Sequence, residues 1–160
     1  MARSRKVNAM ADETSREVFR TLREDQRKYT YFLLAAAGAA IGLAVNQTQG
    51  SAISCSQVPL AIAVIAWGLS FFFGCRHLAY VSSNLYANAE LLKVESGKHP
   101  QVGNHPQMIQ AASAGIREAF NENSNRANRL GHLQFRFLIG GAVSYVIWHV
   151  FEMYLRLHST

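Results

Sequence analysis

Charge is missing from residues 29–75, a stretch without Asp, Glu, Lys or Arg in a 160-residue chain whose net charge is +6. Two apolar runs, 29–47 and 58–75, lie within this stretch on either side of a polar piece, 48–57. A third run, 137–155, carries a single acid, Glu152. A helix needs about 20 mostly apolar residues to cross the hydrocarbon of a bilayer. The missing charge therefore predicts three membrane-spanning helices, the first two joined by a short polar turn.

A polar face is missing as well. Helices of a small soluble domain present one polar side to water, and the sequences AAAGAAIGLAV and AIAVIAWG have none. A cleaved signal peptide does not explain the first run, because its leader would be 28 residues long and would contain five acids. The sequence thus predicts an all-α integral membrane protein with three transmembrane helices and a cytoplasmic helical hairpin between the second and the third.

The charge distribution divides the chain into four segments. We expect a cytoplasmic, basic amphipathic leader helix at 1–28, a transmembrane helical hairpin at 29–75, a cytoplasmic helical hairpin at 76–136, and the third transmembrane helix with a short external tail at 137–160. Lys and Arg flank the first two runs but are absent from the turn between them, so the positive-inside rule places both flanks in the cytoplasm. The N-terminus is then cytoplasmic and the C-terminus external, in an inner (plasma) membrane.

Cysteine is scarce, and its placement excludes a disulfide within the chain. Cys55 lies in the polar turn and Cys75 at the other end of the second run, so about 20 helical residues separate them by roughly 30 Å. Cys55 could instead pair between subunits or be a plain small residue. His77, His99 and His105 have neither the i, i+4 nor the C-x-x-C spacing that holds an ion, so no metal and no cofactor is predicted.

Enzyme motifs are absent too. The sequence has no Walker loop, dinucleotide glycine motif, nucleophile elbow or His-Glu-x-x-His helix. It also lacks the internal repeat that secondary transporters generally show. These absences favour a pore, an anchor or an interaction protein over a common enzyme class.

Helix signals are present in both cytoplasmic segments. In the leader, Thr14 and Glu17 make a capping-box pair, which predicts a helix running into the first span. Between residues 76 and 136, Gly97 is a predicted helix C-cap and Pro106 a predicted helix start, with a turn between them. We expect the two flanking helices to zip together through apolar faces made of Leu78, Val81, Leu85, Ala89 and Leu92 on one helix and Met108, Ala112, Ile116, Ala119 and Phe120 on the other.

The sequence RANRLGH at 126–132 resembles the Arg-x4-6-His signature of HEPN ribonucleases. In that family the Arg and the His act on RNA across a dimer, so the resemblance implies a membrane-tethered ribonuclease with Arg126 and His132 as its catalytic residues. The same stretch is equally typical of the solvated start of the third transmembrane helix.

Small residues mark one face of the first span. Gly38 and Gly42, with Ala35 and Ala39, leave a smooth surface that lets another helix approach closely, either within the chain or between subunits. The second span is bulkier, with Trp67 and the sequence SFFFGC, and is the predicted lipid-facing helix.

The third span carries a polar stripe. Gly141 is followed at helical spacing by Tyr145, His149, Glu152 and Arg156, which places all five on one helix face. Ionisable groups in hydrocarbon usually face protein or water. The stripe therefore either lines a water path or closes hydrogen bonds, with Asn46 and Gln47 as candidate partners, while Glu152 and Arg156 can also form an interfacial pair.

These features support two main functions. The first is a small homo-oligomeric inner-membrane protein that forms a pore or perturbs membrane permeability. The second is a non-conducting anchor or adaptor whose cytoplasmic hairpin binds a protein or a small signal, and the HEPN-like ribonuclease is a third. Membrane lipid and further copies of the chain are the expected partners, and the leader lacks the aromatic or base-reading residues that would indicate nucleic acid.

Overall fold

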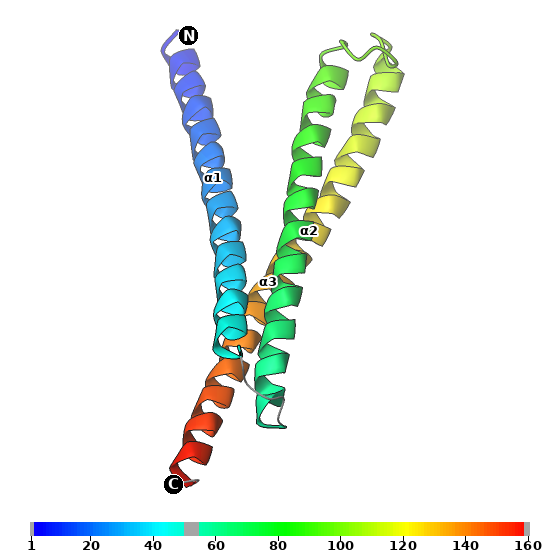
Figure 1. Ribbon diagram of the computed structural model, residues 1–160. Helices are drawn as coiled ribbons and strands as arrows, with labels where there is room; N and C mark the ends of the chain where they lie inside the picture. Colours follow the sequence, from blue (N-terminus) through cyan, green and yellow to red (C-terminus); the bar gives the residue numbers. More distant parts are fainter. Residues whose placement is uncertain (1, 50–54, 159–160) are drawn as a thin grey trace. The chain divides into compact units, whose positions relative to one another are not determined.

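The computed structural model describes residues 2–49 and 55–158, which are helical apart from turns (Figure 1). Helix α1 covers Ala2–Gln47, the short 3-10 helix η1 covers Cys55–Gln57, α2 covers Val58–Glu95 and α3 covers Pro106–His158. Three segments, Arg20–Gln47, Val58–Glu95 and Pro106–Leu155, are long and apolar enough to cross a membrane. The prediction of an all-helical chain with three candidate spans is confirmed, and no strand occurs among the residues described.

The chain forms two units, Met1–Phe32 and Leu33–Thr160, and the first consists of the N-terminal part of α1. The helix begins at Ala2, so Thr14 lies in its interior. The capping-box prediction for Thr14 and Glu17 is therefore wrong, because such a pair satisfies free N–H groups only at the start of a helix. Val18 and Leu22 are exposed on this unit.

Both ends of the turn between α2 and α3 lie where the sequence predicts them. Helix α2 ends at Glu95, and Gly97 follows with a φ of 67°, a conformation that residues with a Cβ rarely adopt. Its N–H donates to the carbonyl of Val94 over 3.0 Å. Helix α3 then begins at Pro106. At the other end of α2, Pro59 lies in the first turn, where its missing N–H costs no hydrogen bond.

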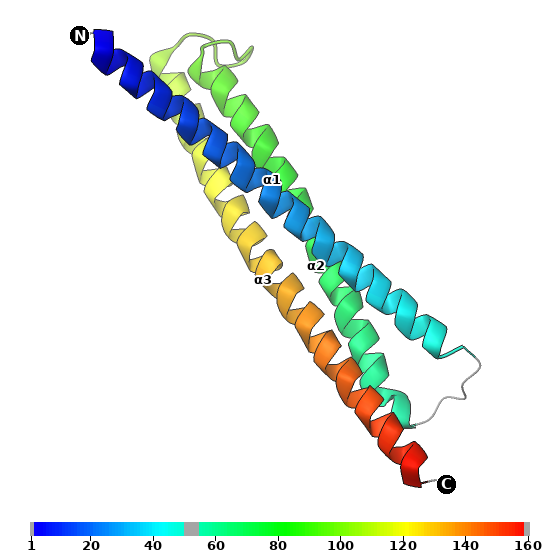
Figure 2. The same cartoon turned by 90° about the vertical axis from the view of Figure 1, so that its left-hand side faces the viewer.

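Helices α2 and α3 run side by side on either side of this turn, as Figures 1 and 2 both show. Their least exposed residues recur at alternating steps of three and four, the spacing of a coiled-coil seam. We call this line of contact the α2–α3 seam. On α2 it consists of Leu60, Ala63, Trp67, Ser70, Gly74, His77, Val81, Asn84, Asn88 and Leu91, and on α3 of Ser113, Ile116, Phe120, Asn123, Ala127, Leu130, Gln134, Phe137, Gly141, Ser144 and Trp148.

The predicted apolar faces of the hairpin match this seam only in part. Val81, Ile116 and Phe120 lie in it, but Leu85 and Leu92 are 47% and 61% exposed, and Ala89, Met108 and Ala119 are exposed as well. The prediction is wrong at these five residues because it followed apolar side chains alone. The helices approach through Ser, Gly, Ala, Asn and His instead, which turns the leucines about 100° away from the contact.

The register of the two helices offsets their apolar segments. Ser144 Oγ donates to the Pro59 carbonyl over 2.7 Å, and Ser70 Oγ donates to the Gln134 carbonyl over 2.8 Å. The apolar run 58–75 therefore faces about residues 130–145 rather than 137–155. The two apolar runs are staggered by about two helical turns, or about 11 Å.

A small core joins the three helices of the second unit. It consists of Ala44 from α1, Leu60, Ala63 and Trp67 from α2, and Trp148 from α3. Trp67 is 4% exposed, and its indole N–H donates to the Leu138 carbonyl over 3.3 Å. The prediction that the second span turns its aromatic residues to lipid is wrong for Trp67, whereas Phe71 and Phe72 are exposed as predicted.

Two glycines make this packing possible. A Cβ added at Gly141 would lie 2.5 Å from the indole nitrogen of Trp67. A Cβ at Gly74 would lie 2.6 Å from the Gln134 amide and 2.7 Å from a methyl of Leu34. Both distances are far inside van der Waals contact. A side chain at Gly141 would have to displace the Trp67 ring, and one at Gly74 the flexible ends of Gln134 and Leu34.

Candidate functional site

The upper part of the predicted polar stripe, around Tyr145, forms contacts within the chain. The Tyr145 hydroxyl donates to Gln47 Oε1 over 2.6 Å, so Gln47 pairs with Tyr145 rather than with His149 or Glu152 in this bond. The Tyr145 ring also stacks on the His149 ring, with centroids 6.4 Å apart, and lies 5.6 Å from the Trp148 ring. The stripe begins as an aromatic cluster that ties α3 to the end of α1.

The lower part of the stripe, from His149 to Arg156, extends past the ends of the other two helices. Helix α1 ends at Gln47, beside Tyr145, and α2 begins at Val58, next to the Pro59–Ser144 contact. Helix α3 continues to His158 beyond this level, as Figures 1 and 2 show. His149 is exposed there and Glu152 is half-buried, while the side chain of Arg156 lies outside the described residues.

The remaining surface of this extension is apolar. Val146, Ile147, Val150, Phe151, Met153, Tyr154, Leu155 and Leu157 are all exposed. The stripe residues occupy an arc of about 80° around the helix, and these apolar residues occupy much of the rest. A helix end of this composition needs lipid or other protein around it rather than water.

The small-residue face of α1 is open in the single chain. A Cβ added at Gly38 or Gly42 would meet no atom within 4 Å, and Ala35 and Ala39 are exposed. Leu33, Ala37 and Ala44, on the opposite side of α1, are the buried residues. No described residue of another helix lies against these two glycines, and packing of this face against another helix stays a prediction.

Arg126 and His132 are not brought together within the chain. They are six residues apart on α3, which separates their directions by about 120° around the helix. The Arg126 guanidinium forms an ion pair with Glu122, and the Tyr80 hydroxyl and the Glu122 carboxylate both raise the pKa of Arg126 above its ordinary value. Arg126 is thus a tightly paired cation, while His132 is exposed.

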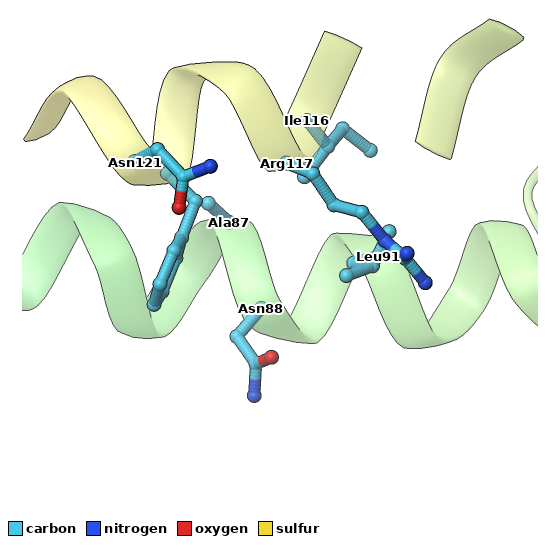
Figure 3. Close-up of a pocket in the computed structure, with 7 residues that line it drawn as sticks. Ala87, Asn88, Leu91, Ile116, Arg117 and Asn121 are labelled. Carbon is cyan, nitrogen blue, oxygen red and sulfur yellow. The ribbon is translucent and has the colours of Figure 1, made fainter. Parts of the chain in front are cut away.

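A groove between α2 and α3 lies well beyond the apolar run of α2 (Figure 3). It is a half-open groove of about 360 Å³ lined by Ala87, Asn88, Leu91, Ile116, Arg117, Phe120 and Asn121. In Figure 3 Arg117 extends from α3 toward α2 beside Leu91. Its guanidinium lies 2.8 Å from the Glu95 carboxylate, so one wall of the groove is an ion pair. Nothing in the sequence indicated this groove, because its residues follow no known motif.

Two of the histidines, His77 and His99, contact other polar groups of the chain. His77 Nδ1 lies 2.8 Å from the Ala127 carbonyl, and His99 Nε2 lies 3.7 Å from Glu90. In the described part of the chain, no three His, Cys, Asp or Glu side chains gather where an ion would bind. Glu90 also accepts a hydrogen bond from Lys93, which holds the pKa of its carboxyl below the ordinary value. The side chain of Cys55 lies outside the described residues.

Polar side chains recur every seven residues along the α2 side of the seam. They are Ser70, His77 and Asn84, and each is hydrogen-bonded to α3: Ser70 to the Gln134 carbonyl, His77 to the Ala127 carbonyl, and Asn84 to Ser124 Oγ over 2.9 Å. A carbonyl can only accept, so His77 Nδ1 carries the proton in its bond. Repeated polar contacts of this kind fix the register of a helix pair.

Comparison of the chain with models of protein families, with curated proteins and with solved structures finds no match. The assignment therefore rests on the helices themselves. They define an all-helical chain in which three helices are long and apolar enough to span a bilayer, an architecture compatible with a membrane protein.

Proposed function

We propose that the chain is a homo-oligomeric membrane protein that changes the permeability of an inner membrane, with its N-terminus and the α2–α3 turn in the cytoplasm and its C-terminus outside. The observation that carries this proposal is the open small-residue face of α1 at Gly38 and Gly42. Small residues four apart let transmembrane helices approach until their backbones are in contact. Two other glycines, Gly74 and Gly141, serve that purpose within the chain, and Gly38 and Gly42 are left for a second copy.

The lower polar stripe of α3 supports the permeability part of the proposal. His149 and Glu152 lie on α3 beyond the ends of α1 and α2. Polar and ionisable groups at membrane depth usually face protein or a water-filled cavity. Several copies with these stripes turned toward a common axis would provide both, with the apolar arc of each α3 facing lipid.

Leucine substitutions in α1 test the assembly. Gly38→Leu and Gly42→Leu add bulk where the backbones of two copies would meet, and we expect the particle mass in mild detergent to fall to that of a monomer. Gly68→Leu is the matched control, because Gly68 is also exposed, with open space around its Cβ position, on another helix. Equal masses for all three variants and the natural chain would contradict assembly through this face.

Glu152→Gln tests the stripe. It removes one charge while keeping the size of the side chain, so a water-lined stripe should retain the oligomer and change its ion selectivity in vesicle flux assays. If the stripe is structural, the same change should instead weaken assembly by an amount comparable to about 1–2 kcal/mol for a membrane hydrogen bond. Normal mass with normal permeability would remove the stripe from the functional account.

A non-conducting anchor is the second candidate, favoured by the groove between α2 and α3. A volume of about 360 Å³ falls in the range of small-molecule sites, and the lining combines apolar walls with Asn and Arg side chains. Overproduction with a membrane-potential dye separates the two functions. Depolarisation supports a pore. An effect of overproduction that leaves the potential intact and is abolished by Leu91→Arg supports the anchor. RNA loss with an intact potential would point to the ribonuclease.

A further inference from the structure

One face of α3 changes from cationic to apolar along its length. The residues of this face follow one another along α3 at steps of three or four, and all of them are exposed. The face lies about 150° from the α2–α3 seam around the helix axis, so it points away from α2. We call it the outward face of α3, and it consists of Arg129, His132, Arg136, Ile139, Val143, Ile147 and Val150.

The basic end of the outward face has no acidic neighbour on its helix. Residues 123–151 contain no Asp or Glu, and Glu122 is paired with Arg126. Among the described residues, Arg129, His132 and Arg136 make no ion pair and no side-chain hydrogen bond, in contrast to Arg117 and Arg126 on the same helix. In the described part of the chain, the two arginine cations and the histidine between them therefore have no partner.

The stagger of the two apolar runs places these cations beside hydrocarbon-facing residues. Gln134 faces Ser70, so Arg129 lies at about the depth of Cys75 and Arg136 at about that of Gly68, inside the run 58–75. Phe71 and Phe72 of α2 are exposed at this depth. A charged side chain in such surroundings must extend to the headgroup layer or bring a polar partner to itself.

We infer that Arg129, His132 and Arg136 bind the phosphate group of an anionic lipid in the leaflet on the side of the α2–α3 turn, with an acyl chain lying along Ile139 and Val143. Guanidinium groups match phosphate oxygens in geometry and charge. Gly140, beside the apolar part of this face, has open space around its Cβ position and leaves room for the chain. The inference depends on α3 crossing a membrane and not on whether the protein conducts.

Lipid retention by the full-length protein tests the site. The protein is reconstituted in nanodiscs of phosphatidylcholine with 20% phosphatidylglycerol, extracted in detergent, and the bound lipids are counted by native mass spectrometry. We expect Arg129→Gln and Arg136→Gln each to lower the preference for phosphatidylglycerol by about fivefold, and the double variant by about 25-fold. Arg117→Gln and Arg126→Gln remove the same charge elsewhere on α3 and should retain the preference.

Two further arms keep the test decisive if the double variant is unstable. In the natural protein, 1 M KCl during extraction should sharply reduce the preference for phosphatidylglycerol, because screening weakens exposed charge contacts. Glycerol phosphate at millimolar concentration should not displace the lipid, since it lacks the acyl chain. Displacement by glycerol phosphate, an equal loss in the Arg117 variant, or a preference independent of salt would each overturn the inference.

Discussion

The part of the chain built from residues 33–47, 58–75 and 130–148 packs differently from the part built from residues 76–95 and 106–129. The first buries two tryptophans against alanines and glycines of three helices and exposes Phe71 and Phe72. The second has two helices, whose seam includes asparagine, serine and histidine, while Leu85 and Leu92 are exposed. In lipid, exposed apolar residues cost nothing, so close packing of small residues decides the structure. In the second part, polar pairs along the seam take over the role of fixing the register.

Removing Trp67 should have the largest effect on this contrast. Trp67→Ala empties the core beside Gly141 and Tyr145, and large-to-small changes of a buried Trp cost about 3–5 kcal/mol of unfolding free energy. Denaturant unfolding in detergent micelles measures the change. Phe72→Ala, at an exposed aromatic residue of the same helix, should stay within about 0.5 kcal/mol, and equal effects would contradict the assigned core.

A pair of neighbouring glycines sharpens the comparison. In Gly141→Ala the new methyl group would overlap the Trp67 ring, so we expect a loss of about 1–3 kcal/mol. Gly140→Ala meets open space and should be neutral or stabilise the helix by up to about 1 kcal/mol. The same unfolding measurement applies to both variants. Opposite signs for adjacent residues are expected only if α3 faces α2 in the register described.

The smallest effect is expected in the polar seam. Asn84 Nδ2 donates to Ser124 Oγ, but Asn84 Oδ1 is buried without a partner among the described residues. Asn84→Ala loses the hydrogen bond but also removes the cost of burying the unpartnered oxygen, so the net change in unfolding free energy is small. A double-mutant cycle with Ser124→Ala should give a coupling of about 0.5–1.5 kcal/mol. As the control, a second cycle pairs Asn84→Ala with Asn125→Ala, because Asn125 is exposed. Coupling to Asn125 of the same size would show that the seam is misassigned.

Much of this architecture follows from the sequence. The uncharged stretch, the end of α2 near Gly97 and the start of α3 at Pro106 are signals of composition and local geometry. The seam was harder to predict because its members are small and polar. A search for large apolar residues at helical spacing selected Leu85 and Leu92, which are exposed, and overlooked the heptad of Ser70, His77 and Asn84.

The candidate sites show the same limit. The sequence places Gly38 and Gly42 on one helix face, but only the packing of Leu33, Ala37 and Ala44 on the opposite side shows that this face is open. The stripe on α3 is visible as a spacing. Its position past the ends of α1 and α2 depends on the register of the helices, and no local pattern of residues encodes that register.

The orientation of the three spans is the central claim, and cysteine accessibility tests it most directly. In a chain with Cys55→Ser and Cys75→Ser, single variants Gln49→Cys and Gln101→Cys place the same new thiol in the α1–α2 turn and the α2–α3 turn, both at exposed residues. A membrane-impermeant maleimide applied to intact cells should label Gln49→Cys at once and Gln101→Cys only after permeabilisation. Labelling of Gln101→Cys in intact cells, or equal labelling of both variants, would contradict the assigned orientation.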